Sequence, residues 1–138
     1  MKVKQISVFL ENKNGRLAEV TNLLSKGGIN LRAATIADTA DFGILRIVCD
    51  KPDQALQILR ENKFTARETD VIGIKVKDEP GALASILNIF EKNHVNIEYL
   101  YSAIMQESEK AVVIFRVENI DHGIKIIEKE GIETISAF

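Results

Sequence analysis

Two short segments place an amide or carboxylate side chain three residues before a glycine, where an apolar strand pattern gives way to a helix pattern. The segments are Asn12-Lys13-Asn14-Gly15 and Asp78-Glu79-Pro80-Gly81. Glycine tolerates unusual backbone angles, and a helix that starts after it leaves several amide N–H groups without partners. Such amides attract a carboxylate, and an oxygen of Asn12 or Asp78 could receive an amine or a hydroxyl. The alternative is that these two side chains cap the helix.

A second polar position recurs 15 residues after each glycine. Asn30 stands in Gly-Ile-Asn-Leu and Asn96 in His-Val-Asn-Ile, where a strand is expected to start. Asparagine is a poor strand residue, so its recurrence indicates a specific hydrogen-bonding role. A simple turn role is the alternative.

These positions recur because the chain repeats itself with an offset of 66 residues. The stretch from Gly15 to Leu31 aligns without gaps on the stretch from Gly81 to Ile97, with six identities among 17 positions. Five further positions exchange one apolar residue for another. The repeat predicts two copies of one small domain, over residues 1–69 and 70–138, so any site is expected twice.

Hydrophobic periodicity predicts strand, helix, strand, strand, helix, strand in each copy. In the first copy, apolar residues at 6, 8 and 10 alternate as in a strand, and those at 17, 20, 23 and 24 have helical spacing that ends at Gly27-Gly28. Its later elements are expected at 29–37, 42–49, from Pro52, and at 64–69. In the second copy, strands are expected at 71–76, 95–104, 111–117 and 132–136, with helices at 81–93 and 121–129.

With right-handed crossovers, the βαββαβ order gives a four-stranded antiparallel sheet, order 4-1-3-2, with both helices on one face. The predicted fold class is therefore α+β, with two ferredoxin-like units in tandem. Phe9, Ile36 and Phe115, or their strand neighbours, are expected on the helix-free face, covered by the other copy or by a second chain. This fold alone says little about function.

Composition narrows the class of partner. The 138 residues are 46% hydrophobic and 28% charged with a net charge of -2, so neither nucleic acid nor a membrane surface is an expected partner. The N-terminus lacks the apolar core of a signal peptide, and no apolar run reaches 18 residues, which predicts a cytoplasmic location. The single cysteine, Cys49, lies in an apolar strand pattern and is expected to be buried.

Catalytic and metal-binding patterns are weak. His94 and His122 lie in unlike places without a second ligand at metal spacing, and no nucleophile triad or glycine-rich phosphate loop is evident. No catalytic residue, metal or cofactor is therefore predicted. Tyr99 and Tyr101, two residues apart, are expected to share one face of a strand.

In both copies the sequence resembles the ACT domain: a strand, then Asn/Asp-x-Asn/Pro-Gly-x-Leu-Ala, a helix, then Gly/His-Ile/Val-Asn-Leu/Ile. ACT domains are regulatory modules of amino-acid metabolism that bind small ligands, commonly amino acids, often between two paired domains. The whole chain is similar to stand-alone proteins that consist of two ACT domains. The resemblance implies a non-enzymatic amino-acid sensor, a homodimer and a possible target enzyme of amino-acid metabolism.

The resemblance also implies which residues bind the ligand. The corner before the first helix would face the start of the second strand of a paired domain. Corner amides would meet the ligand carboxylate, and the side-chain oxygens of Asn12 and Asn30, or of their counterparts, would meet its amino group. The implied residues are Asn12, Gly15, Arg16, Leu17, Asn30 and Leu31 in the first copy, and Asp78, Gly81, Ala82, Leu83, Asn96 and Ile97 in the second.

The two copies depart from each other at the corner. The first copy has Asn14 where the family usually has proline, whereas the second keeps Pro80. Asp78 would favour a ligand ammonium but repel a carboxylate, so the first corner is the better carboxylate site. Asp38 and Asp41 could hold a basic ligand side chain or could be solvated turn residues.

Three alternatives stay open. The chain could be an oligomerisation or protein-interaction module that regulates an enzyme. It could be an acylphosphatase-like hydrolase, which needs an arginine cradle, but Arg16 is the only arginine near either corner. It could bind RNA through Asp41-Phe42-Gly43-Ile44, although the chain is acidic and only 6% aromatic.

Overall fold

The computed structural model describes residues 2–11, 13–38, 42–107 and 109–138, with the backbone alone at 38 and 105–107. Each predicted element has a counterpart there, and none of the described helices is long and apolar enough to cross a membrane. The elements are β1 (Lys2–Glu11), α1 (Arg16–Lys26), β2 (Leu31–Asp38), β3 (Phe42–Cys49), α2 (Pro52–Glu61), β4 (Thr65–Lys77), α3 (Ala82–Lys92), β5 (Ile97–Glu107), β6 (Lys110–Val117), α4 (Ile120–Glu130) and β7 (Thr134–Ile135).

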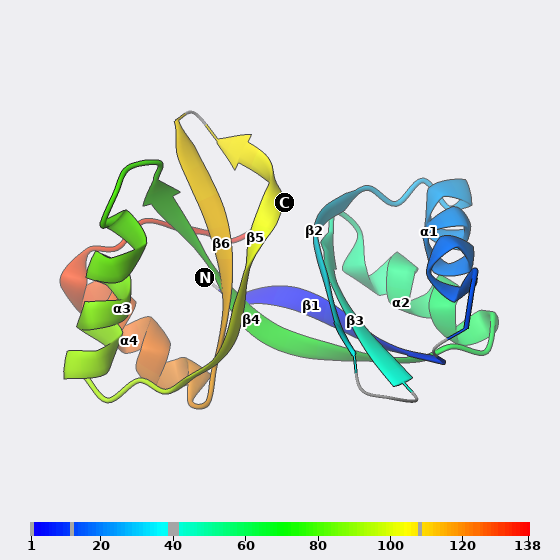
Figure 1. Cartoon of the computed structure of the whole chain (residues 1–138), viewed down its shortest axis with the longest axis horizontal. Coiled ribbons are helices and arrows are strands. Elements are labelled where there is room, and N and C mark those ends of the chain that lie inside the picture. The colour runs from blue at the N-terminus through cyan, green and yellow to red at the C-terminus, as the bar shows by residue number, and fades with distance from the viewer. Residues whose placement is uncertain (1, 12, 39–41, 108) are drawn as a thin grey trace. The chain divides into compact units, whose positions relative to one another are not determined.

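The chain divides into two compact units. The N-terminal unit contains Lys4–Thr69 together with Phe138, and the C-terminal unit contains Asp70–Ala137 together with Met1–Val3. In each unit the two helices lie on one face of its strands (Figure 1).

The strands of the N-terminal unit are antiparallel neighbours in the predicted order. β3 lies between β1 and β2, with Ile47 opposite Ile6 on one side and Ala34 on the other. β1 also pairs with β4, and Lys4 forms an ion pair with Glu68 (3.4 Å). The order is therefore β4-β1-β3-β2, with α1 and α2 as the crossovers.

The C-terminal unit repeats this arrangement. Ile74 of β4 is opposite Val113 of β6 on one side and Thr134 of β7 on the other, and β6 pairs with β5. The order is β7-β4-β6-β5, which is the same 4-1-3-2 pattern. The predicted α+β class with two ferredoxin-like βαββαβ units is confirmed.

One predicted boundary between elements is wrong. Strands were expected separately at 64–69 and 71–76, but the structure has the single strand β4 across both. The segment Glu68-Thr69-Asp70-Val71 contains neither glycine nor proline, so nothing in it forces the extended backbone to turn.

Each unit has its own core between helices and sheet. In the N-terminal unit alternate residues of β1 and β3 meet Val20, Leu24 and Leu59. Cys49 is buried in this core, as predicted. In the C-terminal unit Phe115 packs edge to face on Phe90 with ring centroids 5.7 Å apart.

Phe115 therefore corrects an expectation. Its ring lies on the helix-facing side of the sheet, not on the helix-free face. The run Val112 to Phe115 is entirely apolar, so alternation could not tell one face from the other. Tyr99 and Tyr101 do share a face, with stacked rings 6.4 Å apart.

Candidate functional site

The corner between β1 and α1 has the backbone that the glycine predicts. Gly15 has φ +88° and is the N-cap of α1, and Gly81 has φ +85° and is the N-cap of α3. In both corners the residue two before the glycine donates its N–H to the last residue of the strand, as Lys13 does to Glu11 (2.7 Å). The duplicated sequence thus builds one corner geometry twice. Asn12 lies outside the described residues.

Arg16 follows Gly15 and is held in place by two neighbours. Its Nη1 donates to Oε2 of Glu19 (2.8 Å), and its guanidinium carbon lies 4.6 Å from the centroid of the Phe64 ring. Its Nε is buried and finds no hydrogen-bond acceptor among the described residues. Arg16 therefore keeps one donor group unused in a fixed position.

A pocket of about 180 Å³ opens at this corner. Arg16, Lys13 and Glu11 supply its charged groups, and Lys13 Nζ lies 2.8 Å from Glu11 Oε2. The hydrogen bond from Lys13, followed by its charge, lowers the pKa of the Glu11 carboxyl. The rest of the lining comes from Leu10, Leu17, Ile36 and Gly43.

An apolar groove of about 290 Å³ adjoins the corner pocket, because Leu17 and Ile36 line both. Leu31 of β2 lies in this groove too, so two implied binding residues, Leu17 and Leu31, are brought together. The hydroxyl of Thr21 donates back to the carbonyls of Leu17 and Ala18 (3.2 and 3.0 Å), which leaves the groove wall without a spare donor there. The remaining lining is Ala34, Thr35 and Leu45.

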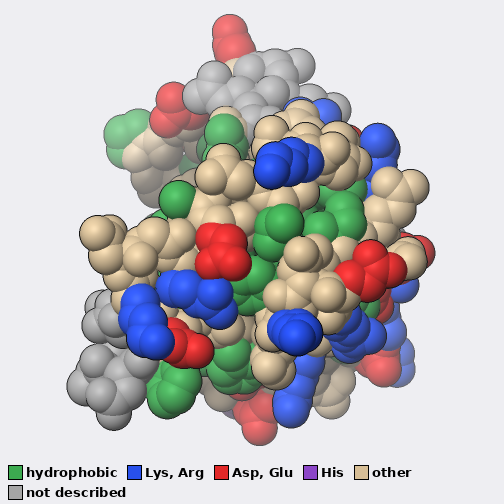
Figure 2. Space-filling view, turned by 90° about the vertical axis from the view of Figure 1, so that its right-hand side faces the viewer, with side chains coloured by type: hydrophobic (Ala, Val, Ile, Leu, Met, Phe, Trp, Pro, Cys, Tyr) green, Lys and Arg blue, Asp and Glu red, His purple; other side chains and the backbone are tan. Residues whose placement is uncertain are grey.

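Apolar side chains on this unit reach the solvent. Leu17 is 44% and Ile36 is 50% exposed. On the side that bears α1 and α2, hydrophobic side chains gather among lysine, arginine and acidic side chains (Figure 2). An apolar ligand group would remove such surface from water.

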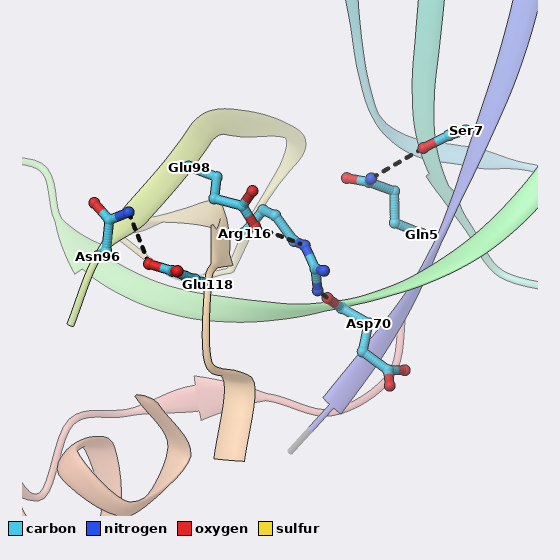
Figure 3. Close-up of polar contacts among 7 residues, drawn as sticks. All are labelled: Gln5, Ser7, Asp70, Asn96, Glu98, Arg116 and Glu118. Atoms are coloured by element: carbon cyan, nitrogen blue, oxygen red, sulfur yellow. Dashed lines mark hydrogen bonds and ion pairs between the residues drawn. The ribbon is translucent and has the colours of Figure 1, made fainter. Parts of the chain in front are cut away.

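Asn30 and Asn96 lie at the far end of the first helix of their units. Asn30 N–H donates to Oδ1 of Asp50 (2.9 Å), and Asn96 Nδ2 donates to Oε2 of Glu118 (3.1 Å), as Figure 3 shows for the second pair. The 11 residues of α1 separate Asn30 from Gly15 by about 16 Å. Within one unit, Asn30 therefore does not meet the Gly15 corner, although Leu17 and Leu31 line the same groove.

The second corner differs in chemistry. Ala82 occupies the place of Arg16, and Asp78 is exposed. In both corners alike, no side-chain hydrogen bond from the described residues caps the helix. Leu83 and Ile97 are partly buried against the core of the C-terminal unit. Of the hairpin aspartates, Asp41 and the side chain of Asp38 lie outside the described residues.

Sequence reasoning missed three contributors to the first site, namely Ile36, Glu19 and Phe64. Strand alternation places Ile36 on the same face as Ala34, two residues away. Its spacing of five from Leu31 is odd, so the two share a groove only because of the β-bulge between Leu31 and Ala33. Phe64 gave no signal, since its contact with Arg16 depends on the tertiary fold.

Comparison with known families decides the relationship. The family model described as "ACT domain pair" matches residues 1–137. The chain belongs to the ACT domain pair family. The corners after β1 and after β4 are thus the two corners of one ACT pair.

Two solved structures are similar to this chain in fold. A protein of Bacteroides thetaiotaomicron, known from a crystal structure, is 44% identical with a TM-score of 0.93, over 99% of this chain and 94% of that one. The ligand-free regulatory subunit of aspartate kinase from Thermus thermophilus is 16% identical with a TM-score of 0.65, over 94% and 93%. The second likeness concerns the fold alone.

Two curated relatives are acetolactate synthase small subunits. The subunit from Buchnera aphidicola is 31% identical over 57% of this chain and 50% of its own length. The subunit from Haemophilus influenzae is 24% identical over 86% of this chain and 65% of its own length. The ACT pair therefore spans between half and two thirds of these relatives.

Proposed function

We propose that this ACT pair, with one ACT domain in residues 1–69 and one in 70–138, is a non-enzymatic sensor of an amino acid with an apolar side chain. The observation that carries the proposal is the continuity of the corner pocket and the apolar groove through Leu17 and Ile36. One end offers cationic donors and the other offers only apolar surface. An α-amino acid with an apolar side chain matches this arrangement, because it has a carboxylate at one end and an apolar group at the other.

The carboxylate of the ligand would lie at the β1–α1 corner. The guanidinium of Arg16, which lines the pocket, and the amides that follow Gly15 are suitable donors, and arginine binds carboxylates strongly. Lys13 adds positive charge to the same pocket. The side chain of the ligand would then extend into the groove toward Leu31.

The amino group needs side-chain oxygens, and within the N-terminal unit α1 keeps Asn30 away from its own corner. We assign it to Asn12 together with Asn30 of a second copy, which makes the sensor a homodimer. The counterpart residues Asp78, Gly81, Ala82, Leu83, Asn96 and Ile97 would form the second, diverged site. Without an arginine at Ala82, that site would hold a carboxylate less tightly.

The target of the sensor would be an enzyme of amino-acid metabolism. The acetolactate synthase small subunits and the aspartate kinase regulatory subunit described above support this class of partner. An interaction module that joins enzyme subunits without a ligand is the alternative. The two functions differ in whether a free amino acid stabilises the chain.

Thermal unfolding with each of the twenty amino acids tests the proposal. At 100 times its Kd a ligand adds about 2.7 kcal/mol, which raises Tm by several degrees for a chain of this size. We expect aliphatic amino acids to raise Tm. The variant Arg16→Gln should abolish this rise, whereas the control Arg67→Gln, at an exposed position, should keep it. Absence of a shift with all twenty amino acids at millimolar concentration would leave the interaction module as the function.

A further inference from the structure

A second pocket, of about 330 Å³, lies at the edge of the C-terminal unit. Strand β4, the first turn of α3 and the segment between α4 and β7 enclose it. Its charged groups are Lys75 and Lys77 of β4, Lys110 of β6, Glu79 and Glu133. Three lysines against two glutamates give it a positive charge on a chain whose net charge is -2.

One lysine of the pocket is paired with a carboxylate, and the other two act on that carboxylate through their charges. Lys110 Nζ lies 2.7 Å from Oε1 of Glu133. That hydrogen bond and the charge of Lys110 lower the pKa of the Glu133 carboxyl, and the charges of Lys75 and Lys77 lower it further. A negative group at this point therefore interacts with all three ammonium groups.

The arrangement carries a cost that an anion would relieve. Lys77 stands directly opposite Lys110 in the β4–β6 register, and Lys75 lies two residues from Lys77 on the same strand face. Like charges opposite each other destabilise a sheet pair. Three lysines and two glutamates, Glu79 and Glu133, line the pocket, so a further anion would meet a net positive charge.

The N-terminal unit shows that the fold does not require these lysines. The repeat places Phe9, Glu11 and Phe42 where the C-terminal unit has Lys75, Lys77 and Lys110, and Glu11 is opposite Phe42 as Lys77 is opposite Lys110. All three cationic positions thus changed together between the copies.

The space itself also differs between the units. In the N-terminal unit the Arg16 side chain covers the Phe64 ring. The counterparts in the C-terminal unit are Ala82 and Ile132, and both line the pocket. The short side chain of Ala82 leaves open the volume that Arg16 fills.

We infer that this lysine pocket binds a small oxyanion that carries two or more negative charges, as a phosphorylated or polycarboxylate metabolite does. Each ammonium group offers three donors, and the volume is at the lower end of small-molecule sites, about 300–1,000 Å³. Ser85 also lines the pocket, but its hydroxyl proton is already donated to the Gly81 carbonyl (3.0 Å), so the lysines are the donors for the anion. The pocket shares Ala82 with the second, diverged corner, and the inference does not depend on amino-acid binding at the Arg16 corner of the N-terminal unit.

Titration of the full chain with sodium phosphate and with sodium citrate tests the inference, with sodium chloride at equal ionic strength as the reference. NMR shifts of the amides of residues 75–77 and 131–133 report occupancy of the pocket. We expect saturable shifts with one or both anions and none with chloride. The anion that saturates at the lower concentration identifies phosphate or polycarboxylate chemistry.

Two variants with opposite expectations complete the test. Lys77→Gln/Lys110→Gln removes two of the three cations. Each exposed charge pair contributes a few-fold to affinity, so the loss of two should weaken anion binding about tenfold. Glu133→Gln removes the internal competitor and should tighten binding. The matched control Lys92→Gln/Lys129→Gln, two exposed lysines outside the pocket, should bind like the unmodified chain.

The inference is overturned if neither anion saturates in the unmodified chain, or if the control weakens binding as much as the pocket variant. It is also overturned if Glu133→Gln weakens binding. Because Glu133→Gln keeps all three lysines, it tests the site even if the double lysine variant fails to fold. The Tm shift that depends on Arg16 should be retained in each variant, because all the changed residues lie in the C-terminal unit, which separates this test from that of the sensor function.

Discussion

The guanidinium of Arg16 lies over the ring of Phe64, with 4.6 Å between the guanidinium carbon and the ring centroid. The contact joins the first turn of α1 to the residue just before β4. It fixes the arginine at the corner pocket and shields a core phenylalanine that is only 5% exposed. The Ala82 and Ile132 pair of the other unit has no such contact, so Arg16 distinguishes the two ACT corners.

Removing the Arg16 side chain should destabilise the N-terminal unit. A cation–π contact at a partly exposed site contributes about 0.5–1 kcal/mol, and uncovering Phe64 adds to the loss. We expect Arg16→Ala to lower the free energy of unfolding in urea by about 1 kcal/mol. Arg67→Ala, at an exposed position of β4, should change it by less than about 0.5 kcal/mol. Equal effects of the two variants would contradict a stabilising contact at Arg16.

Much of the fold could be predicted from the sequence because its signals are local. The apolar alternation of β1, the glycine at each ACT corner and the burial of Cys49 all depend on neighbouring residues. The strand pattern and the corner glycine recur in the second copy of the repeat. The unbroken strand β4 was missed because the repeat boundary was assumed to be a structural boundary.

The site was less predictable because its parts come from distant segments. Nothing near Arg16 indicates that Phe64 lies beneath it, and nothing near Lys77 indicates that Lys110 lies opposite. Asn30 and Gly15 recur at a constant spacing, yet α1 holds them at its two ends. Spacing along the chain therefore predicts candidate residues but not which of them meet within a unit.

Alanine at either corner glycine should be destabilising through the backbone alone. Gly15 and Gly81 have positive φ, and a Cβ placed on either would have no heavy atom within 4 Å among the described residues. The left-handed conformation costs an L-residue about 1–2 kcal/mol, so we expect Gly15→Ala and Gly81→Ala each to lose about 1 kcal/mol in urea unfolding.

Asparagine provides the control for this prediction, because it visits the left-handed region more readily than alanine. Gly15→Asn should therefore recover part of the stability that Gly15→Ala loses. If the alanine and asparagine variants were equally stable, backbone conformation would not be the reason for glycine at the corner.

The single thiol should make stability depend on pH in the alkaline range. Burial raises the pKa of Cys49, so the thiol stays neutral in the folded chain while the unfolded chain ionises near its ordinary pKa of about 8.5. The unfolded state then binds fewer protons, and the free energy of unfolding falls as pH rises from about 8.5 toward the higher folded pKa. Below about pH 8 the contribution is fully present.

Comparison with Cys49→Ala isolates this effect, because alanine does not titrate. We expect the stability difference between the unmodified chain and Cys49→Ala to be constant from pH 6 to 8 and to shrink from pH 8.5 to 10. Urea unfolding at each pH measures it. A difference that stayed constant up to pH 10 would show that the folded thiol ionises as readily as the unfolded one.

Each unit carries one non-glycine residue in the left-handed conformation where the other unit has glycine. His94 (φ 55°) corresponds to Gly28 (φ 72°) after the first helix, and Lys63 (φ 65°) corresponds to Gly131 (φ 66°) after the second. At all four positions the N–H donates to a carbonyl three residues earlier, as His94 does to Glu91 (3.2 Å). The four helices therefore end with the same left-handed backbone turn, whether the residue there is glycine or a residue that rarely adopts it.

His94→Gly and Lys63→Gly should accordingly stabilise the chain. Relief of the left-handed cost of about 1–2 kcal/mol exceeds the extra unfolded-state entropy of glycine, about 0.5–1 kcal/mol, which leaves a gain of about 0.5–1 kcal/mol each. The exchange should leave the contact of His122 Nε2 with the Asn93 carbonyl (2.8 Å) in place, since no atom of the His94 side chain takes part in it. Gly28→Ala and Gly131→Ala, the reverse changes, should lose stability in the same urea experiment. A loss in both glycine variants would mean that the His94 and Lys63 side chains make stabilising contacts that outweigh the backbone strain.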